Sequence, residues 1–317
     1  MNPTAQTLRP EGPTLFSEAA ENWLRARQTE LKSSSIVKYR NILNRHLLPR
    51  FGPLPLDRIR REELLACGRE LLSAGLSPRS AGAILAVMRS ILCFSQRSGF
   101  AAEDPGPVTF RPKQEPLRVF SRSEQQRLTA YLLARGDLAA RGALLSLYTG
   151  LRIGELCALT WGDISVEDRC IHVRHTMQRL QTLGPGPKTA VQITAPKSQS
   201  SQRTIPLPDW MMTELLRLRR PDSCYFLTGS EKYMEPRTME NRFRSALDAC
   251  GIRGASFHTC RHSFATRCIE LGFDVKTLSE ILGHATVNIT MNRYVHPSLE
   301  FKRESMNRLA ALIPEKE

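Results

Sequence analysis

Two arginines, two histidines and a tyrosine stand out, because each lies in a short polar motif that a plain helical domain does not need. The motifs are Thr149-Gly150-Leu151-Arg152-Ile153-Gly154-Glu155-Leu156, His258-Thr259-Cys260-Arg261-His262 and Leu282-Gly283-His284, the last followed ten residues later by Tyr294. A guanidinium group can bind two non-bridging phosphate oxygens, an imidazole can carry a proton, and a phenol can be a nucleophile. Together these groups suit a reaction at a phosphodiester.

Each of these residues also has an ordinary structural explanation. Arg152 alone would cap a helix or pair with Glu155. His258 or His284 alone would be a hydrogen-bonded histidine near a helix end, and Tyr294 could belong to any amphipathic helix. The ordered combination makes coincidence a poor explanation, because five independent features would have to agree.

Two neighbours of these residues are assigned to structural roles: Glu155 would hold the arginine turn, and His262 is taken as structural too. His258, Cys260 and His262 would be candidate metal ligands by type. Residues at i, i+2 and i+4 do not converge on one helix face, however, and no fourth ligand is evident. We therefore expect no metal site here.

In order and in local motif, the chain resembles the tyrosine recombinases, the phage-integrase family of site-specific recombinases. The family signature is an arginine in a T-G-x-R-x-x-E-L turn, a lysine in a β-hairpin, H-x-x-R, a histidine in L-G-H and a tyrosine just beyond. The matching positions are, in that order, Arg152, Lys197, His258, Arg261, His284 and Tyr294. The resemblance covers nearly the whole chain.

The resemblance implies a mechanism. Tyr294 would attack the scissile phosphorus, forming a 3′-phosphotyrosyl bond and releasing a 5′-hydroxyl. Arg152 and Arg261 would clamp the non-bridging oxygens. Lys197 would protonate the departing oxygen, His258 would take the phenol proton, and His284 would donate to the phosphate. Because one ester replaces another, no ATP, metal or other cofactor is implied.

Two residues could fill the lysine position, because Lys188 also lies in the hairpin region. Lys197 is preferred, since Pro196-Lys197-Ser198 stands at a strand-to-turn junction ahead of Arg203-Thr204-Ile205-Pro206, as in the family.

The implied function is site-specific recombination or integration, most like that of mobile-element integrases. The implied partners are double-stranded DNA with inverted-repeat core sites and three further copies of the chain, as a homo-tetramer on two DNA sites. Two alternatives remain open: a type IB topoisomerase-like relaxation of DNA, and a non-enzymatic DNA-binding protein.

The charge of the chain fits a polyanionic partner. The 317 residues include 45 Lys and Arg against 31 Asp and Glu, a net charge of +14. Up to residue 118 there are 18 basic and 11 acidic residues, and after it 27 and 20, so each part carries +7. Both parts of the chain are therefore expected to bind the polyanion.

The length suits two domains, and the composition suits a folded protein. Four prolines at positions 105, 107, 112 and 116 indicate a linker. The expected divisions are a flexible N-terminus (1–13), a helical core DNA-binding domain (14–101), the linker (102–118), the catalytic domain (119–297) and a C-terminal helix open to subunit exchange (298–317).

Apolar residues recur at helical spacing through most of the chain. Ser77-Pro78 and Ser121-Arg122-Ser123-Glu124 are helix-start signals. Between Asp168 and Pro206, short β-prone runs around Ile171, Val191 and Ile205 predict a small antiparallel sheet. The fold class is therefore mainly α with a small antiparallel β-sheet: a helical N-terminal core-binding domain plus an α+β catalytic domain.

The terminal segment carries an apolar stripe of Met306, Leu309, Ala310 and Ile313. This stripe would pack either on its own domain or, as the family resemblance implies, on a neighbouring subunit.

The eight cysteines include no C-x-x-C pair, and no stretch resembles a signal peptide or a membrane span. A reducing, cytoplasmic location is expected.

Overall fold

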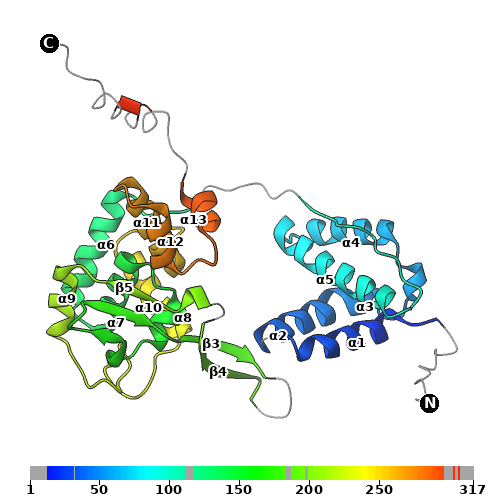
Figure 1. Cartoon of the computed structure of the whole chain (residues 1–317), viewed down its shortest axis with the longest axis horizontal. Coiled ribbons are helices and arrows are strands. Elements are labelled where there is room, and N and C mark those ends of the chain that lie inside the picture. Colours follow the sequence, from blue (N-terminus) through cyan, green and yellow to red (C-terminus); the bar gives the residue numbers. More distant parts are fainter. Residues whose placement is uncertain are drawn as a thin grey trace, which may run out of the picture. The chain divides into compact units, whose positions relative to one another are not determined.

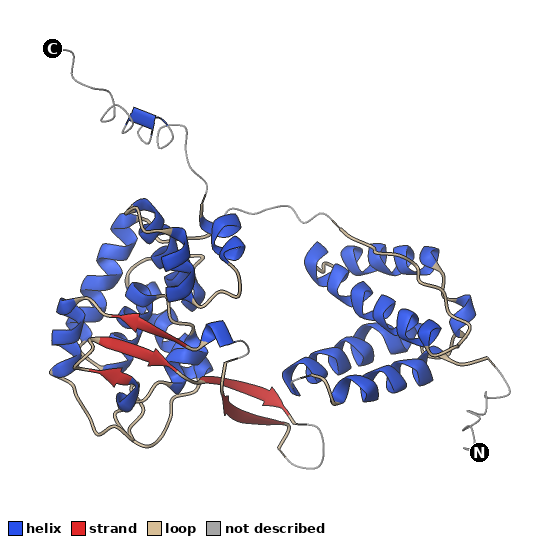
Figure 2. Cartoon of the chain, viewed as in Figure 1, coloured by secondary structure: helices blue, strands red, loops and turns tan. Residues whose placement is uncertain are grey.

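The computed structural model describes residues 13–31, 33–110, 117–182, 187–196, 199–295, 303 and 306–307. Helices dominate these residues and strands form a small part of them (Figure 2). The predicted fold class, mainly α with a small antiparallel sheet, is confirmed. None of the described helices is both long and apolar enough to cross a membrane.

The chain divides into two compact units. One comprises Met1–Glu115 with Leu180–Lys188, and the other comprises Pro116–Arg179 with Thr189–Glu317. The division between residues 115 and 116 falls inside the proline-containing stretch.

Helices around one apolar core build the first unit (Figure 1). They are α1 (Phe16–Gln28), α2 (Ser33–Ile42), the π-helical segment η1 (Leu43–Leu47), α3 (Leu48–Phe51), the 3-10 segment η2 (Leu56–Arg58), α4 (Arg61–Ser73) and α5 (Pro78–Arg97). Phe16, Trp23 and Phe51 fill the core and are at most 2% exposed. The predicted start of α5 is confirmed, because the Ser77 side chain accepts a hydrogen bond from the backbone N–H of Ser80.

The π-helical segment was not predicted. The apolar residues Tyr39, Leu43 and Leu47 are spaced by four, and such a row drifts around an ideal α-helix of 3.6 residues per turn. The wider π turn offsets this drift, so that Leu43 and Leu47 both lie in the core.

The first half of the predicted linker is anchored to the first unit. Arg89 binds both carboxylate oxygens of Asp104 at 2.7 Å, and Arg61 donates to the carbonyl of Pro105 at 2.6 Å. The Phe110 ring packs so closely over Gly68 that a Cβ there would clash with it. Residues 102–110 are therefore part of this unit's packing.

The second unit holds the remaining elements, apart from the last two residues of β3, which fall in the first unit. They are α6 (Arg122–Arg135), α7 (Leu138–Thr149), α8 (Ile153–Ala158), η3 (Trp161–Asp163), β1 (Ile164–Ser165), β2 (Cys170–Val173), β3 (Thr176–Gln181), β4 (Thr189–Thr194), η4 (Gln199–Ser201), β5 (Arg203–Pro206), α9 (Asp209–Leu216), α10 (Pro236–Ala249), α11 (Phe257–Glu270), α12 (Val275–Leu282) and α13 (Val287–Tyr294). Helix α7 is buried along nearly its whole length, and the predicted capping box of Ser121 and Glu124 opens α6. In Figure 1, α11, α12 and α13 gather at one end of this unit.

The strands form two sheets rather than one. Strands β1, β2 and β5 make an antiparallel sheet in which Ile171 lies opposite both Ile164 and Ile205. The run around Val191 belongs instead to β4, which pairs with β3 in a separate hairpin. Strand β3 was missed because only Met177 in it is buried, so its sequence lacks the apolar alternation of a core strand.

The predicted C-terminal helix lies mostly outside the described residues. Arg303, Met306 and Asn307 are helical and exposed. Leu309, Ala310 and Ile313 lie outside the described residues. The exchange of this segment between subunits therefore stays a prediction.

Candidate active site

Arg261 on α11 is the most deeply buried charged side chain of the site, at 2% exposure. Its guanidinium donates to the carbonyl of Gly150 at 2.8 Å and to that of Leu282 at 2.7 Å. These carbonyls lie at the C-terminal ends of α7 and α12, so Arg261 ties the two helix ends together. Burial, with the charge of Arg152, lowers the pKa of Arg261 to about 9, which still leaves it protonated at neutral pH.

Arg152 begins α8 directly after the turn that ends α7. Gly150 ends α7 with a φ of 70°, in the left-handed region that glycine adopts readily. Arg152 donates to Glu155 at 2.6 Å and contacts the carbonyl of Gly283 at 3.4 Å. Its side chain is 35% exposed, so it can reach a ligand.

Glu155 is the buried anion that holds two of the arginines. Its carboxylate accepts hydrogen bonds from the Arg152 backbone N–H at 3.0 Å and from Arg203 at 3.1 and 2.9 Å. Burial alone would raise the pKa of Glu155, but Arg203 and Arg152 outweigh it and leave the pKa below its ordinary value. The expected structural role of Glu155 thus has a physical basis.

Arg203, the first residue of β5, was not singled out from the sequence. Its side chain is 5% exposed, and besides Glu155 it binds the carbonyls of Ile281 and Ser201. It therefore connects β5, the strand that follows Lys197, with the first turn of α8 and the last turn of α12. Sequence spacing gave no sign of this role, because Glu155 and Ile281 are far away in the chain.

His284 follows the glycine that ends α12. Gly283 has a φ of 66°, and the His284 Nδ1 atom lies 2.7 Å from the hydroxyl of Thr290. The ring stacks on Tyr294 with centroids 6.4 Å apart and planes 5° apart. Burial and the charge of Arg261 lower the pKa of His284 to about 4.

Tyr294 is the last residue of α13 and is 7% exposed. Its hydroxyl oxygen lies 2.9 Å from His262 Nδ1. Burial raises the pKa of the phenol, although Arg261 and Arg293 oppose the shift. The nucleophile expected from the sequence is thus present but held as a neutral phenol.

Among the described residues, the hydrogen-bond partner of the phenol is His262, not His258. His258 is exposed, and its ring meets the His262 ring edge-on with centroids 4.4 Å apart. Although the side chain is exposed, the protein atoms around it keep water from part of the ring. This desolvation, with the positive charge of Arg261, lowers the pKa of His258 to about 4. The sequence did contain a signal for His262. Residues 258, 261 and 262 stand at i, i+3 and i+4, so His262 shares a helix face with the two expected site residues.

Five of the six expected site residues come together in the second unit: Arg152, His258, Arg261, His284 and Tyr294. Lys197 lies outside the described residues. Lys188 is described and exposed. No other described residue adds a negative charge to this cluster besides Glu155.

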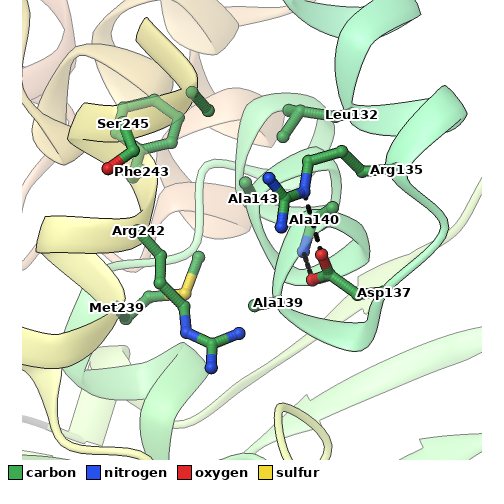
Figure 3. Close-up of a pocket in the computed structure, with 11 residues that line it drawn as sticks. Leu132, Arg135, Asp137, Ala139, Ala140, Ala143, Met239, Arg242, Phe243 and Ser245 are labelled. Atoms are coloured by element: carbon green, nitrogen blue, oxygen red, sulfur yellow. Dashed lines mark hydrogen bonds and ion pairs between the residues drawn. The ribbon is translucent and has the colours of Figure 1, made fainter. Parts of the chain in front are cut away.

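Two other features lie away from these residues. In the described part of the chain, the group of side chains spaced to hold a metal ion is Asp168, Cys170 and His172, none of which belongs to the site. A pocket between α6, α7 and α10 is lined by the charged residues Arg135, Asp137 and Arg242, by Ser245 and by apolar side chains (Figure 3). No site residue lines it.

Each of the two units contains a region that matches a known protein family. Residues 119–300 match the phage integrase family, and residues 15–66 match the N-terminal SAM-like domain of phage integrases. Tyrosine recombinase XerA of Pyrococcus furiosus is 28% identical over 93% of this chain and 95% of its own length. A XerC-like tyrosine recombinase of Caldanaerobacter subterraneus is 27% identical over 72% of this chain, which spans 64% of that relative.

Solved structures show the same fold. The Tn1549 transposon integrase in complex with transposon right end DNA has a TM-score of 0.79 at 22% identity, covering 94% of this chain and all of that one. A lambda integrase dimer bound to a core site has a TM-score of 0.68 at 15% identity, covering 89% and 95%.

Proposed function

The chain belongs to the phage integrase family and is a tyrosine-type site-specific DNA recombinase, and from this premise we propose that Tyr294 is its nucleophile. The observation that carries the proposal is the surrounding cluster, in which two arginines and three imidazoles converge on one buried phenol. In the reaction, the Tyr294 oxygen bonds to phosphorus while the bond from phosphorus to the 5′ oxygen breaks.

Arg152 and Arg261 are proposed to bind the non-bridging oxygens. Both are held before any ligand arrives, Arg152 by Glu155 and Arg261 by two backbone carbonyls. Such preorganised donors act on the charge that develops in the transition state, and each contributes about 10²–10³ in rate.

The lowered pKa values of the histidines also support an anion site. His258 and His284 have pKa values of about 4, because they are poorly hydrated and face Arg261 and Arg152. A phosphodiester between the arginines would offset their charge and raise these pKa values again. His258, which is exposed, would then accept the phenol proton, and His284 would donate to a phosphate oxygen.

Lys197 is proposed to protonate the departing 5′ oxygen. Its role depends on the family resemblance, because it lies outside the described residues. The second strand's 5′-hydroxyl then attacks the phosphotyrosyl bond, and the phenol is regenerated.

The finer partners are proposals as well. We propose DNA with inverted-repeat core sites and a homo-tetramer on two such sites, supported by the similarity to a lambda integrase tetramer bound to a Holliday junction, with a TM-score of 0.65. We propose the cytoplasm as its location, because the eight cysteines are free thiols and the cytosol keeps thiols reduced. No described feature favours the topoisomerase or the non-enzymatic alternative.

A nicked suicide substrate tests the proposal. Wild-type protein should form a denaturant-resistant adduct on a 3′ end, and Tyr294→Phe should bind the DNA but form no adduct. Tyr131→Phe is the matched control and should behave like wild type. An adduct in Tyr294→Phe, or one on a 5′ end, would refute the assignment.

A further inference from the structure

His262 contacts the nucleophile on one side and a cation on the other. Its Nδ1 atom lies 2.9 Å from the Tyr294 oxygen, and its Nε2 atom lies 3.5 Å from a guanidinium nitrogen of Arg293. We propose that His262 is a positioning residue that donates its Nδ1 proton to the Tyr294 oxygen, with Arg293 fixing the tautomer. This inference rests on the proposed role of Tyr294 as the nucleophile.

The direction of the hydrogen bond follows from the tautomer. A neutral imidazole has one nitrogen that donates and one that accepts, and a guanidinium only donates. Since Arg293 faces Nε2, that nitrogen is the acceptor and the ring proton lies on Nδ1. The Tyr294 oxygen then accepts from His262, and its own O–H proton points elsewhere.

The surroundings of His262 keep it neutral. The charged and titratable groups that face it are His258 and Arg261 on its own helix, Arg293 on α13, and His284. Burial, with these groups, lowers the pKa of His262 to about 3. An imidazole with so low a pKa is a poor base for a phenol, but its N–H can stabilise negative charge as it grows on the oxygen.

The ring is also held in place. His262 is 7% exposed, and the His258 ring meets it edge-on at 88°. The charge of Arg261 acts on the Tyr294 phenol and opposes the rise in its pKa, so the hydrogen bond with His262 holds the Tyr294 oxygen near the guanidinium that would bind the phosphate. His262 exchanges no atom with the substrate, so its contribution is orientation and charge.

Two amide variants separate this role from simple packing. In His262→Asn the amide nitrogen stands two bonds from Cβ, as Nδ1 does, so it keeps the donor near the phenol. In His262→Gln the nitrogen stands three bonds from Cβ, at the place of Nε2. The two side chains have the same chemistry but put the donor in different places.

Single-turnover adduct formation would be measured on the nicked substrate at saturating DNA, from about pH 6 to about pH 10, for the full-length protein. We expect His262→Gln to be slower than wild type by about 10–10² at neutral pH, with the defect shrinking at high pH as the phenol ionises without help. His262→Asn should stay within about 10-fold of wild type.

Arg293→Met should give a smaller defect in the same direction, and adding it to His262→Gln should slow the reaction little further, because both changes act on one hydrogen bond. Additive effects would overturn the tautomer part of the proposal.

Equal rates for His262→Asn and His262→Gln, or a defect that is the same at every pH, would overturn the positioning role. The two failures are distinguishable: wild-type protein that binds DNA yet forms no adduct would refute the proposed function itself. Thermal unfolding of each variant shows whether a lost rate reflects a lost fold.

Discussion

Arg203 donates two hydrogen bonds to the carboxylate of Glu155 across 48 residues of chain, and both side chains are at most 5% exposed. Because Glu155 also binds Arg152, this pair links the start of β5 to the turn that carries Arg152. A buried contact thus sets the direction of the half-buried side chain that is proposed to bind the phosphate.

Glu155→Gln should destabilise the protein by about 3 kcal/mol, because breaking a buried ion pair leaves Arg203 without its anion. The matched control is Asp209→Asn, which breaks the exposed pair with Arg169 and should cost less than about 1 kcal/mol. Urea unfolding of the two variants measures the difference. Similar midpoints for both would contradict a structural role for the Glu155 network.

Gly283→Ala should reduce cleavage by about 10-fold or more, since a small displacement of His284 and Arg203 misaligns the site. Gly283 has a φ of 66°, and a Cβ there would lie 2.9 Å from the Arg203 side chain and 3.0 Å from the Ser200 carbonyl oxygen. Gly251 has nearly the same φ of 67°, with nothing within 4 Å. Gly251→Ala should therefore cost about 1–2 kcal/mol of backbone strain and leave the single-turnover rate intact.

Lys197→Ala should cripple cleavage of ordinary DNA by about 10²–10⁴, because the 5′ oxygen would leave without a proton. The rate should recover on DNA whose 5′-bridging oxygen is replaced by sulfur, since a thiolate needs no proton to leave. Lys188→Ala, in the exposed hairpin region, should match wild type on both substrates. If only Lys188→Ala shows the defect and the sulfur rescue, the lysine was assigned wrongly.

Acid should weaken the fold before most carboxylates titrate. Burial lowers the pKa of His262 and of His284 from 6.5 to about 3 and about 4. Below about pH 6.5 the unfolded chain therefore binds protons that the folded chain does not, and stability falls by up to about 1.4 kcal/mol per pH unit for each imidazole.

Urea unfolding at about pH 7 and about pH 5 measures this loss. His284→Asn should make the pH dependence shallower by removing one of these imidazoles. A slope unchanged by that substitution would show that other groups cause the loss.

Local patterns predicted much of the structure. Apolar spacing predicted the helices, and Ser77 and Ser121 act as the caps that their positions indicated. The order of the arginine, histidine and tyrosine motifs predicted that Arg152, Arg261 and Tyr294 would meet in one site. These features depend on neighbours within a few residues, or on motifs that the resemblance supplied.

The remainder depends on long-range contacts that no local pattern contains. Arg203 is buried only because Glu155, Ile281 and Ser201 offer partners, and two of these lie far along the chain. The spacing of His262 from His258 put both on one helix face, but His262 was taken as structural because only the folded chain shows that α13 brings a phenol to its Nδ1 atom. Strand β3 was missed because its pairing with β4, rather than an apolar face, defines it.

The position of Arg261 has a consequence for how such a protein can lose its activity over evolutionary time. Its two hydrogen bonds to Gly150 and Leu282 join the ends of α7 and α12, so a substitution there should damage the fold together with the proposed phosphate site. Tyr294, at the last position of α13, contributes one hydroxyl that phenylalanine can replace without losing the ring. A lineage that drifts toward a DNA-binding protein without cleavage should therefore lose the tyrosine early and keep the buried arginine.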